Sequence, residues 1–187
     1  LLSAPDCYME KIAIGADLPK NLLDLDNSVE ENINLLARAK NKKKEEITAC
    51  ILKRDRHNNI VNSLVKQNVK INFIPDGDVM GVISVIDKNS PIDIYMGIGG
   101  APEGVLAAAA ISCFGGQMQT RLVLEDDNQK KRAKKMGIKD HKKKYNIEEM
   151  IKGDVMFFAS AITNGDLIPG IKKDINGYTI KFYIKFV

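Results

Sequence analysis

Segments with strand character and segments with helix character take turns along most of this chain, at intervals of about 15 to 25 residues. Short β-rich or alternating runs predict strands at residues 8–15, 47–53, 69–74, 92–96 and 118–124. Helical spacing of apolar residues predicts helices between them, at 29–40, 58–68, 79–86, 102–114 and 126–135. Such alternation is typical of βαβ units, so we predict a layered α/β fold around a mostly parallel sheet.

The helix at 29–40 has the clearest start signal, because Ser28 and Glu31 form a capping-box pattern. Asn146 and Glu149 repeat that pattern and predict a helix at 146–152. The remaining C-terminal residues predict a buried strand at 155–162 and a terminal strand at 178–186. A chain of 187 residues suits one domain, residues 1–187, with a sizeable core.

Charge argues against a nucleic-acid partner. The net charge is only +4, and the basic tracts at 40–44 and 139–144 are short, with acidic residues nearby. We predict that both tracts are solvated loops. Aromatic residues are sparse and do not interleave with the basic ones, which argues against a base-stacking surface.

Targeting signals are not visible in the sequence. No run of about 18 apolar residues exists, which argues against a membrane span, and no signal peptide is recognisable. Cys7, Cys50 and Cys113 are far apart and predict small buried side chains in a reducing compartment rather than a zinc site. We predict a cytoplasmic protein, with a plastid as the alternative. The chain opens without Met, which is typical of a piece cut from a longer protein.

Three polar turns follow predicted strands, at residues 54–57, 76–78 and 97–104. In open α/β sheets, ligands bind beyond the carboxyl ends of the strands. We therefore expect the three turns to lie on one rim of the sheet and to form a single ligand site.

The glycine-rich turn at 97–104 carries the strongest motif. Glycines allow close approach of the backbone, Pro102 suits the first position of a helix, and the amides of a helix start favour an anion such as phosphate. Glu103 could then hold a divalent cation beside that phosphate. Equally, the turn could be only a good helix start, with Glu103 interacting with the helix dipole. Pro102 stands where a dinucleotide-binding fingerprint needs glycine, and the Gly-Lys-Ser/Thr of a phosphate-binding loop is absent.

The other two turns each allow a functional and a structural explanation. Arg54 and Arg56 suit bidentate phosphate contacts if the backbone between them is extended, or they are a surface pair partly neutralised by Asp55. Asp76 and Asp78 could accept hydrogen bonds from sugar hydroxyls or join a metal shell, or they only favour the turn.

Together and in this order, these motifs resemble the class II fructose-1,6-bisphosphatases, including the type that also hydrolyses sedoheptulose-1,7-bisphosphate. The resemblance extends to about Gly170 and rests on residues 4–11, 54–57, 76–79, 96–110, 115–122 and 153–166. The long run at 96–110 is the most specific of these stretches, and the Asp-Gly-Asp turn is the least specific.

The resemblance implies a layered α/β sugar phosphatase that uses Mg or Mn to remove the 1-phosphate of the bisphosphate. It implies a place in gluconeogenesis or the Calvin cycle and a homo-oligomer, either dimer or tetramer. Glu103 matches the catalytic, metal-binding glutamate of the family. The positions that match its substrate contacts are Tyr8, Arg54, Arg56, Asp76, Gly77, Asp78 and Gly100.

Two departures qualify the resemblance. An N-terminal region that supplies most of the metal-binding carboxylates in the family has no counterpart here, so we expect a C-terminal substrate-binding domain that is inactive alone. The tail from Lys172 onward also departs from the family's usual ending. Two other hypotheses stay open, a non-catalytic sugar-phosphate-binding module and a nucleotide-binding oxidoreductase domain.

Overall fold

The computed structural model describes residues 1–165, 168–175 and 177–186. Asp166, the last residue of the family-like stretch 153–166, lies outside them. In chain order the elements are β1 (Tyr8–Ile14), α1 (Val29–Ala39), η1 (Lys44–Glu46), β2 (Thr48–Leu52), η2 (Asp55–His57), α2 (Asn58–Lys66), β3 (Lys70–Ile74), α3 (Asp78–Ile83), β4 (Ile94–Gly100), α4 (Ala101–Ser112), β5 (Gln117–Val123), α5 (Asp127–Lys135), β6 (Lys144–Asn146), α6 (Ile147–Met150), β7 (Met156–Ser160), β8 (Lys172–Asp174), β9 (Gly177–Thr179) and β10 (Phe182–Phe186).

A six-stranded sheet in the order β3-β2-β4-β1-β5-β6 forms the centre of the molecule. β2 pairs in parallel with β3 and β4, whereas β1 runs antiparallel to both β4 and β5. Four of the six strands, β2, β3, β4 and β5, therefore point the same way, which confirms the mostly parallel sheet. β1 and β6 run against them, a feature that alternation of elements does not reveal.

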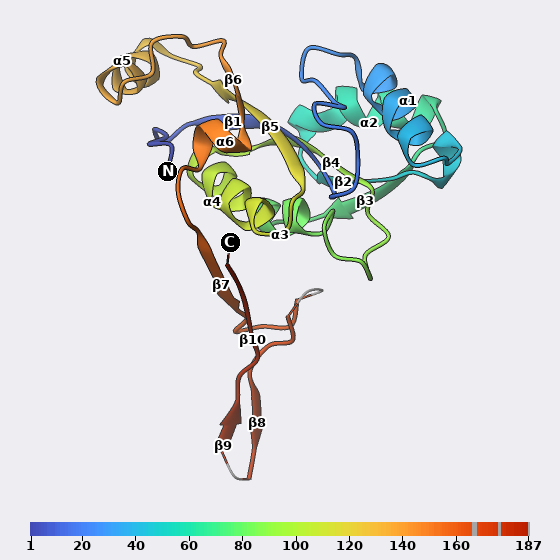
Figure 1. Ribbon diagram of the computed structural model, residues 1–187, viewed down its shortest axis with the longest axis vertical. Coiled ribbons are helices and arrows are strands. Elements are labelled where there is room, and N and C mark those ends of the chain that lie inside the picture. Colours follow the sequence, from blue (N-terminus) through green and yellow to red (C-terminus); the bar gives the residue numbers. More distant parts are fainter. Residues whose placement is uncertain (166–167, 176, 187) are drawn as a thin grey trace.

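Helices cover both faces of the sheet and give the predicted α/β layering (Figure 1). α3, α4 and α6 share one apolar core with side chains such as Met9 and Tyr95. α1 and α2 pack on the opposite face, against side chains such as Ile12 and Ile94. Because strand side chains alternate between faces, adjacent β1 residues such as Ile12 and Ala13 enter different cores.

The cap of α1 is as the sequence predicted. Ser28 accepts a hydrogen bond from the Glu31 amide at 3.1 Å, and the Glu31 carboxylate accepts one from the Ser28 amide at 2.8 Å. Asn146 and Glu149 also form their capping box, but the helix behind it, α6, ends at Met150 and is shorter than predicted. All three cysteines are buried, as expected for small apolar side chains.

The basic tracts predicted to be solvated loops are partly engaged in ion pairs, so that prediction is wrong in part. Lys40 and Lys42 both pair with the buried Asp93. Lys144 pairs with Asp24 and, at 2.6 Å, with Asp26. Burial of a carboxylate requires compensating charge, and Lys40 and Lys42 supply it for Asp93.

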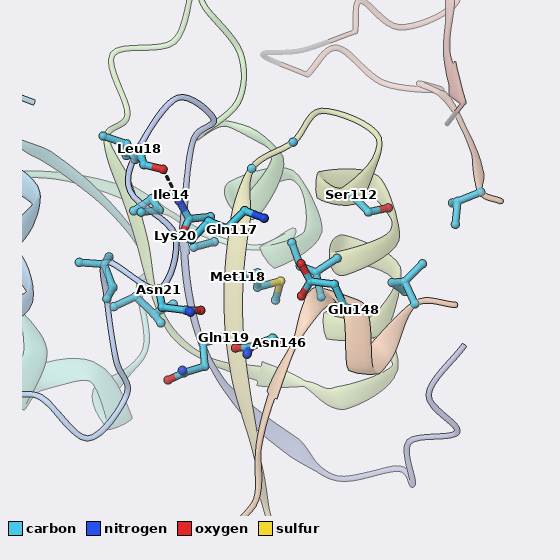
Figure 2. A pocket seen from close by; sticks show the side chains of 18 of the residues that line it. Ile14, Leu18, Lys20, Asn21, Ser112, Gln117, Met118, Gln119, Asn146 and Glu148 are labelled. Carbon is cyan, nitrogen blue, oxygen red and sulfur yellow. Dashed lines mark hydrogen bonds between the residues drawn. The ribbon is translucent and has the colours of Figure 1, made fainter. Parts of the chain in front are cut away.

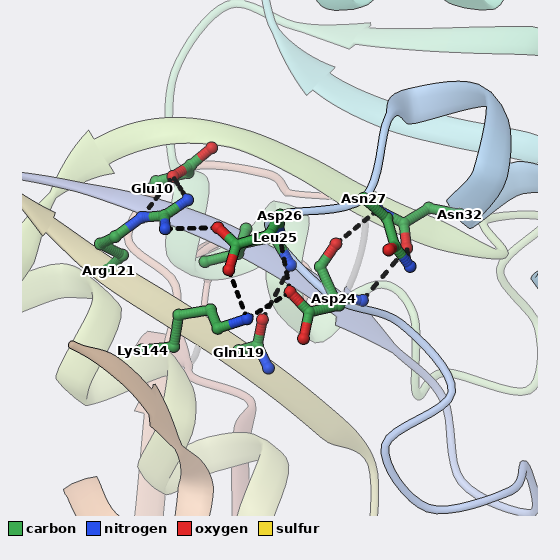
Figure 3. Close-up of polar contacts among 9 residues, drawn as sticks. All are labelled: Glu10, Asp24, Leu25, Asp26, Asn27, Asn32, Gln119, Arg121 and Lys144. Atoms are coloured by element: carbon green, nitrogen blue, oxygen red, sulfur yellow. Dashed lines mark hydrogen bonds and ion pairs between the residues drawn. The ribbon is translucent and has the colours of Figure 1, made fainter. Parts of the chain in front are cut away.

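Figure 3 shows how the ion pairs of Lys144 with Asp24 and Asp26 hold a long loop against the sheet. Arg121 of β5 donates to Glu10 of β1 at 3.0 Å and to Asp26 of the loop between β1 and α1 at 2.6 Å. Gln119 accepts a hydrogen bond from the Leu25 amide at 2.8 Å. The loop is therefore held over β1 and β5 by side chains of the strands.

The C-terminal residues form an arm that leaves the body of the molecule (Figure 1). β7 pairs with β10, and β8 pairs with β9, in two separate two-stranded sheets. The strand predicted at 155–162 is present in part as β7, but the prediction that it is buried is wrong. Phe157 is buried, whereas Met156 and Phe158 are exposed. The predicted terminal strand at 178–186 is divided between β9 and β10, since the chain turns between them.

Candidate functional site

The site forms where β2 and β4 lie side by side and their following helices leave to opposite faces. α2, after β2, packs on the face with Ile12 and Ile94, whereas α4, after β4, packs on the face with Met9 and Tyr95. Open α/β sheets bind their ligands where helices diverge in this way, and we call this place, at the carboxyl ends of β2 and β4, the crevice. The turns after β2, β3 and β4 all lie on that edge, together with the start of the antiparallel β1, since Tyr8 pairs with Gly100. The prediction that the three polar turns share one rim is confirmed.

His57 lies between the ends of β2 and β4 and is fully buried. Its Nδ1 is 2.7 Å from the Leu52 carbonyl oxygen, and its Nε2 accepts a hydrogen bond from the Ile98 amide at 2.8 Å. Because Nε2 accepts, the proton belongs on Nδ1, and the ring is neutral. Burial lowers the pKa of His57, and Arg56 and Arg54 lower it further, whereas the hydrogen bond to the Leu52 carbonyl opposes them.

The two arginines of the first turn are anchored separately. Arg56 donates from Nε to the Ile98 carbonyl at 2.9 Å, and its guanidinium lies 4.8 Å from the centre of the Tyr8 ring. Arg54 donates to the carbonyls of Lys53 and Pro75, at 2.9 and 2.7 Å. Residues 55–57 form the short helix η2, so the backbone between the arginines is not extended as the bidentate arrangement required. Arg54 is directed to the end of β3 and Arg56 to the end of β4.

The Asp-Gly-Asp turn places its two acids in opposite environments. Asp76 is almost fully exposed, with its side chain 94% accessible. Asp78 is buried and paired with Lys11, whose ammonium also donates to the Gly100 carbonyl at 2.8 Å. Burial lowers the pKa of Lys11, and the Asp78 carboxylate opposes that effect. A Cβ atom at Gly99 would collide with this carboxylate, which explains a glycine there without any ligand.

The start of α4 differs from the glycine-rich turn that the sequence predicted. Gly97 to Gly100 belong to β4, and the helix begins at Ala101. The Ala101 amide donates to the Cys7 carbonyl at 2.9 Å, and Pro102 has no amide proton. Two of the first helical positions therefore offer no donor to an anion. The Glu103 side chain is exposed and turns back toward Gly100.

A complete divalent-cation site is not formed by these side chains. Mg²⁺ and Ca²⁺ take six or more oxygen ligands, several of them from carboxylates or water. Across residues 1–165, 168–175 and 177–186, no group of three or more His, Cys, Asp or Glu side chains could hold a metal ion. Glu103 could supply one oxygen ligand, whereas Asp78 is already paired with Lys11.

Two residues of the rim were not singled out by the sequence, Lys11 and His57. Lys11 lies in β1 at a position that faces the core. A lysine at such a position is the only sign in the sequence that its side chain has a buried partner. His57 directly follows Arg56, and a lone histidine beside two arginines gives no indication of its hydrogen bonds. Both side chains bond backbone atoms at the ends of β2 or β4, which only the fold brings near them.

A cavity of about 490 Å³ lies at the other edge of the sheet, where Ile14 of β1 pairs with Gln117 of β5. Figure 2 shows polar and apolar side chains around it, including Lys20, Asn146 and Glu148. The Gln117 amide donates to the carbonyls of Leu18 and Pro19, so part of this polarity holds the loop after β1. None of the predicted site residues lines this cavity.

Among the helices that the structure describes, none is long and apolar enough to cross a membrane.

Comparison with known proteins gives the family of this chain. The family model described as "Bacterial fructose-1,6-bisphosphatase, glpX-encoded" matches residues 1–184. The class 2 fructose-1,6-bisphosphatase/sedoheptulose 1,7-bisphosphatase of Trichodesmium erythraeum is 37% identical over 95% of this chain and 55% of the relative. The class 2 fructose-1,6-bisphosphatase of Haemophilus influenzae is 35% identical over 94% of this chain and 56% of the relative. The chain thus spans about half the length of these curated relatives. It belongs to the glpX-type family of bacterial fructose-1,6-bisphosphatases.

Proposed function

We propose that this chain is the substrate-binding part of an enzyme that hydrolyses the 1-phosphate of fructose-1,6-bisphosphate, and that sedoheptulose-1,7-bisphosphate is a second substrate. The relatives from Trichodesmium and Haemophilus are both named as fructose-1,6-bisphosphatases, and the one from Trichodesmium is also named as a sedoheptulose 1,7-bisphosphatase. The reaction would be a metal-assisted transfer of the phosphoryl group to water. Mg²⁺ or Mn²⁺ would supply the charge stabilisation for that transfer.

The observation that supports this proposal best is the crevice between β2 and β4. It gathers two arginines, an aromatic ring and the start of a helix at the edge where open α/β sheets bind ligands. Arginine suits a phosphate because its planar guanidinium offers paired donors. These groups are of the kinds that bind a sugar phosphate, which supports the proposal.

Each rim residue has a proposed role in holding the substrate. Arg54 and Arg56 would bind the phosphate that is not cleaved. Since the Arg56 Nε atom is occupied by the Ile98 carbonyl, its terminal nitrogens would meet the phosphate. The remaining contacts to the sugar would come from Tyr8, Asp76, Gly77, Asp78 and Gly100. Glu103 would contribute one oxygen to the metal shell.

Isothermal titration calorimetry of residues 1–187 tests the binding part of the proposal. We expect fructose-1,6-bisphosphate and fructose 6-phosphate to bind, and Arg56→Ala to weaken both roughly 10- to 150-fold, or about 1.5–3 kcal/mol. Fructose 1-phosphate, which lacks the anchored phosphate, should change little. Arg38→Ala, an exposed arginine on α1, is the matched control. Equal losses for all three sugars would contradict the assignment of Arg56.

Phosphate release by the complete encoded polypeptide, with Mg²⁺ or Mn²⁺, tests the hydrolytic part. Glu103→Gln should abolish turnover while the sugar bisphosphate still binds, because the exposed side chain contributes little to folding. Binding without turnover in the unmodified polypeptide would instead favour a non-catalytic sugar-phosphate-binding module.

A further inference from the structure

The hydrogen-bond ladder between β2 and β4 stops before the crevice. Only two residue pairs, Ala49 with Ile94 and Cys50 with Tyr95, are in register across these strands. Both strands continue beyond this point, β2 to Leu52 and β4 to Gly100. Over those last residues the backbones have no ladder bonds to fix their separation.

His57 spans that separation. Its ring joins the Leu52 carbonyl at 2.7 Å to the Ile98 amide at 2.8 Å, so one imidazole stands where a direct backbone bond would otherwise form. The fit is close, because a Cβ atom at Gly97 would lie 3.2 Å from Nε2. A side chain at position 97 would press against the ring, which accounts for the glycine.

The same residue of β4 also places the phosphate-binding arginine. Ile98 donates its amide to His57 and accepts the Arg56 Nε hydrogen at its carbonyl. The position of the Arg56 guanidinium over Tyr8 thus depends on where Ile98 lies. His57 acts on the site through Ile98.

We propose that His57 is a positioning residue, whose neutral ring holds β2 and β4 apart at the crevice and thereby sets Arg56 in place for a sugar phosphate. The proposal rests on the proposed function for its ligand. Its geometric part, the Leu52–His57–Ile98 bridge, stands without a ligand. Protonation of the ring would remove the Nε2 acceptor and break the bond to Ile98.

The groups that face the ring are basic or neutral. Arg54 and Arg56 approach it from its own turn. From β4, the buried Tyr95 hydroxyl lies beside Gly97 and has no hydrogen-bond partner among the described residues. These neighbours favour the neutral ring on which the bridge depends.

Three substitutions separate the two bonds. Asn at position 57 can donate to Leu52 but is too short for Ile98, Gln can accept from Ile98 but not donate to Leu52, and Phe keeps the volume without either bond. We expect His57→Asn and His57→Phe to weaken fructose-1,6-bisphosphate binding at pH 7.5 at least tenfold in calorimetry. His57→Gln should restore most of that affinity. Equal losses in all three variants would overturn the proposal.

The pH profile gives a readout that a purely structural histidine would not move. Binding should weaken on acidification more in the unmodified chain than in His57→Gln, and the ratio of the two affinities cancels protonation of the ligand phosphates. A constant ratio between pH 8 and the acid limit of folding would overturn the proposal.

Nitrogen-15 NMR of the unliganded chain decides the geometric part, whether or not a sugar phosphate binds. The bridge requires a protonated Nδ1 and an unprotonated Nε2 at pH 7.5, and a shift of the Ile98 amide signal in His57→Asn. The opposite tautomer, or an unchanged Ile98 signal, would overturn the bridge. Failure of the unmodified chain to bind any of the sugar phosphates, with this tautomer present, would reject the proposed function alone.

Discussion

The central sheet and the C-terminal arm place side chains against the usual rule of burial, in opposite directions. In β1, the lysine Lys11 is 1% exposed, whereas in β7 the phenylalanine Phe158 is 57% exposed. The sequences of the two strands, YMEKIAI and MFFAS, do not show which strand is covered. β1 lies between β4 and β5 with helices on both faces, while β7 has one strand neighbour, β10. The number of neighbours, and not hydropathy, determines what each position tolerates.

The difference has a functional side. In the sheet, burial forces polar groups into specific partnerships, as Lys11 with Asp78 and His57 with Ile98 show. These partnerships lie at the crevice and fix its geometry. In the arm, apolar side chains such as Phe158 and Phe182 contact each other, with ring centres 5.7 Å apart, while both stay largely exposed. Specific pairs of buried polar groups are thus a feature of the sheet, whereas the arm pairs exposed aromatic rings.

Asp78→Asn should give the largest effect, because it leaves the Lys11 ammonium buried without its counter-ion. Breaking a buried pair from one side costs about 3–5 kcal/mol in the free energy of unfolding. Asp76→Asn, in the same turn but exposed, should change it by no more than about 0.5 kcal/mol. Urea denaturation followed by circular dichroism measures both. Similar values for the two variants would show that burial does not separate these acids.

Phe157→Ala and its neighbour Phe158→Ala compare the two faces of the arm directly. Phe157 is 7% exposed and packs with Ile83, Ala110 and Cys113, so its loss should cost about 3 kcal/mol. Phe158→Ala should cost at most about 1 kcal/mol, the value of an aromatic pair. Thermal and urea unfolding of both variants measure the difference. If Phe158→Ala were the more damaging change, the exposed face of the arm would be the one that stabilises the molecule.

The elements that sequence predicted well are those with local signals. Capping of α1 by Ser28 depends on residues three positions apart, and the carboxyl-edge location of the three polar turns depends only on strand and helix order. Both are correct in the structure. Helix α4 is also close to its predicted range. Pro102 favours a helix start, and the small apolar residues that follow it favour a helix over other structures.

What the sequence missed depends on contacts between distant residues. The glycines at 97–100 looked like a turn because glycine is common in turns, but the pairing of β4 with β1 keeps them extended. The roles of Lys11 and His57 need partners more than 40 residues away, at Asp78 and Ile98. The direction of β1 is likewise set by pairing, and local pattern carries no record of it.

Acidification should destabilise the sheet by a smaller amount, through His57. Burial holds the pKa of the folded-state ring below its ordinary value, so between the two values the unfolded chain binds more protons. The contribution of His57 to the free energy of unfolding is therefore complete above the ordinary histidine pKa. It decreases as the pH falls below that value. One site contributes a slope of at most about 1.4 kcal/mol per pH unit. Urea unfolding at pH 7.5, 6.5 and 5.5 should show a slope in the unmodified chain that is reduced in His57→Gln; equal slopes would contradict a buried neutral ring.

Glu10→Gln should give the smallest effect, although Glu10 is next to Lys11 in β1 and also forms an ion pair. Its carboxylate bonds Arg121 at 3.0 Å, but both side chains are partly exposed, and Arg121 keeps its contact with Asp26. Water and salt screen such a pair, so the loss should be about 0.2–1 kcal/mol in dilute buffer. It should shrink further in 1 M NaCl, where the Asp78→Asn effect persists because its pair is buried. Unfolding free energies of the unmodified chain and both variants at 0.05 and 1 M NaCl measure this contrast. A salt-independent loss above about 2 kcal/mol would mean that the loop between β1 and α1 buries the Glu10 pair as completely as α3 and α4 bury that of Lys11.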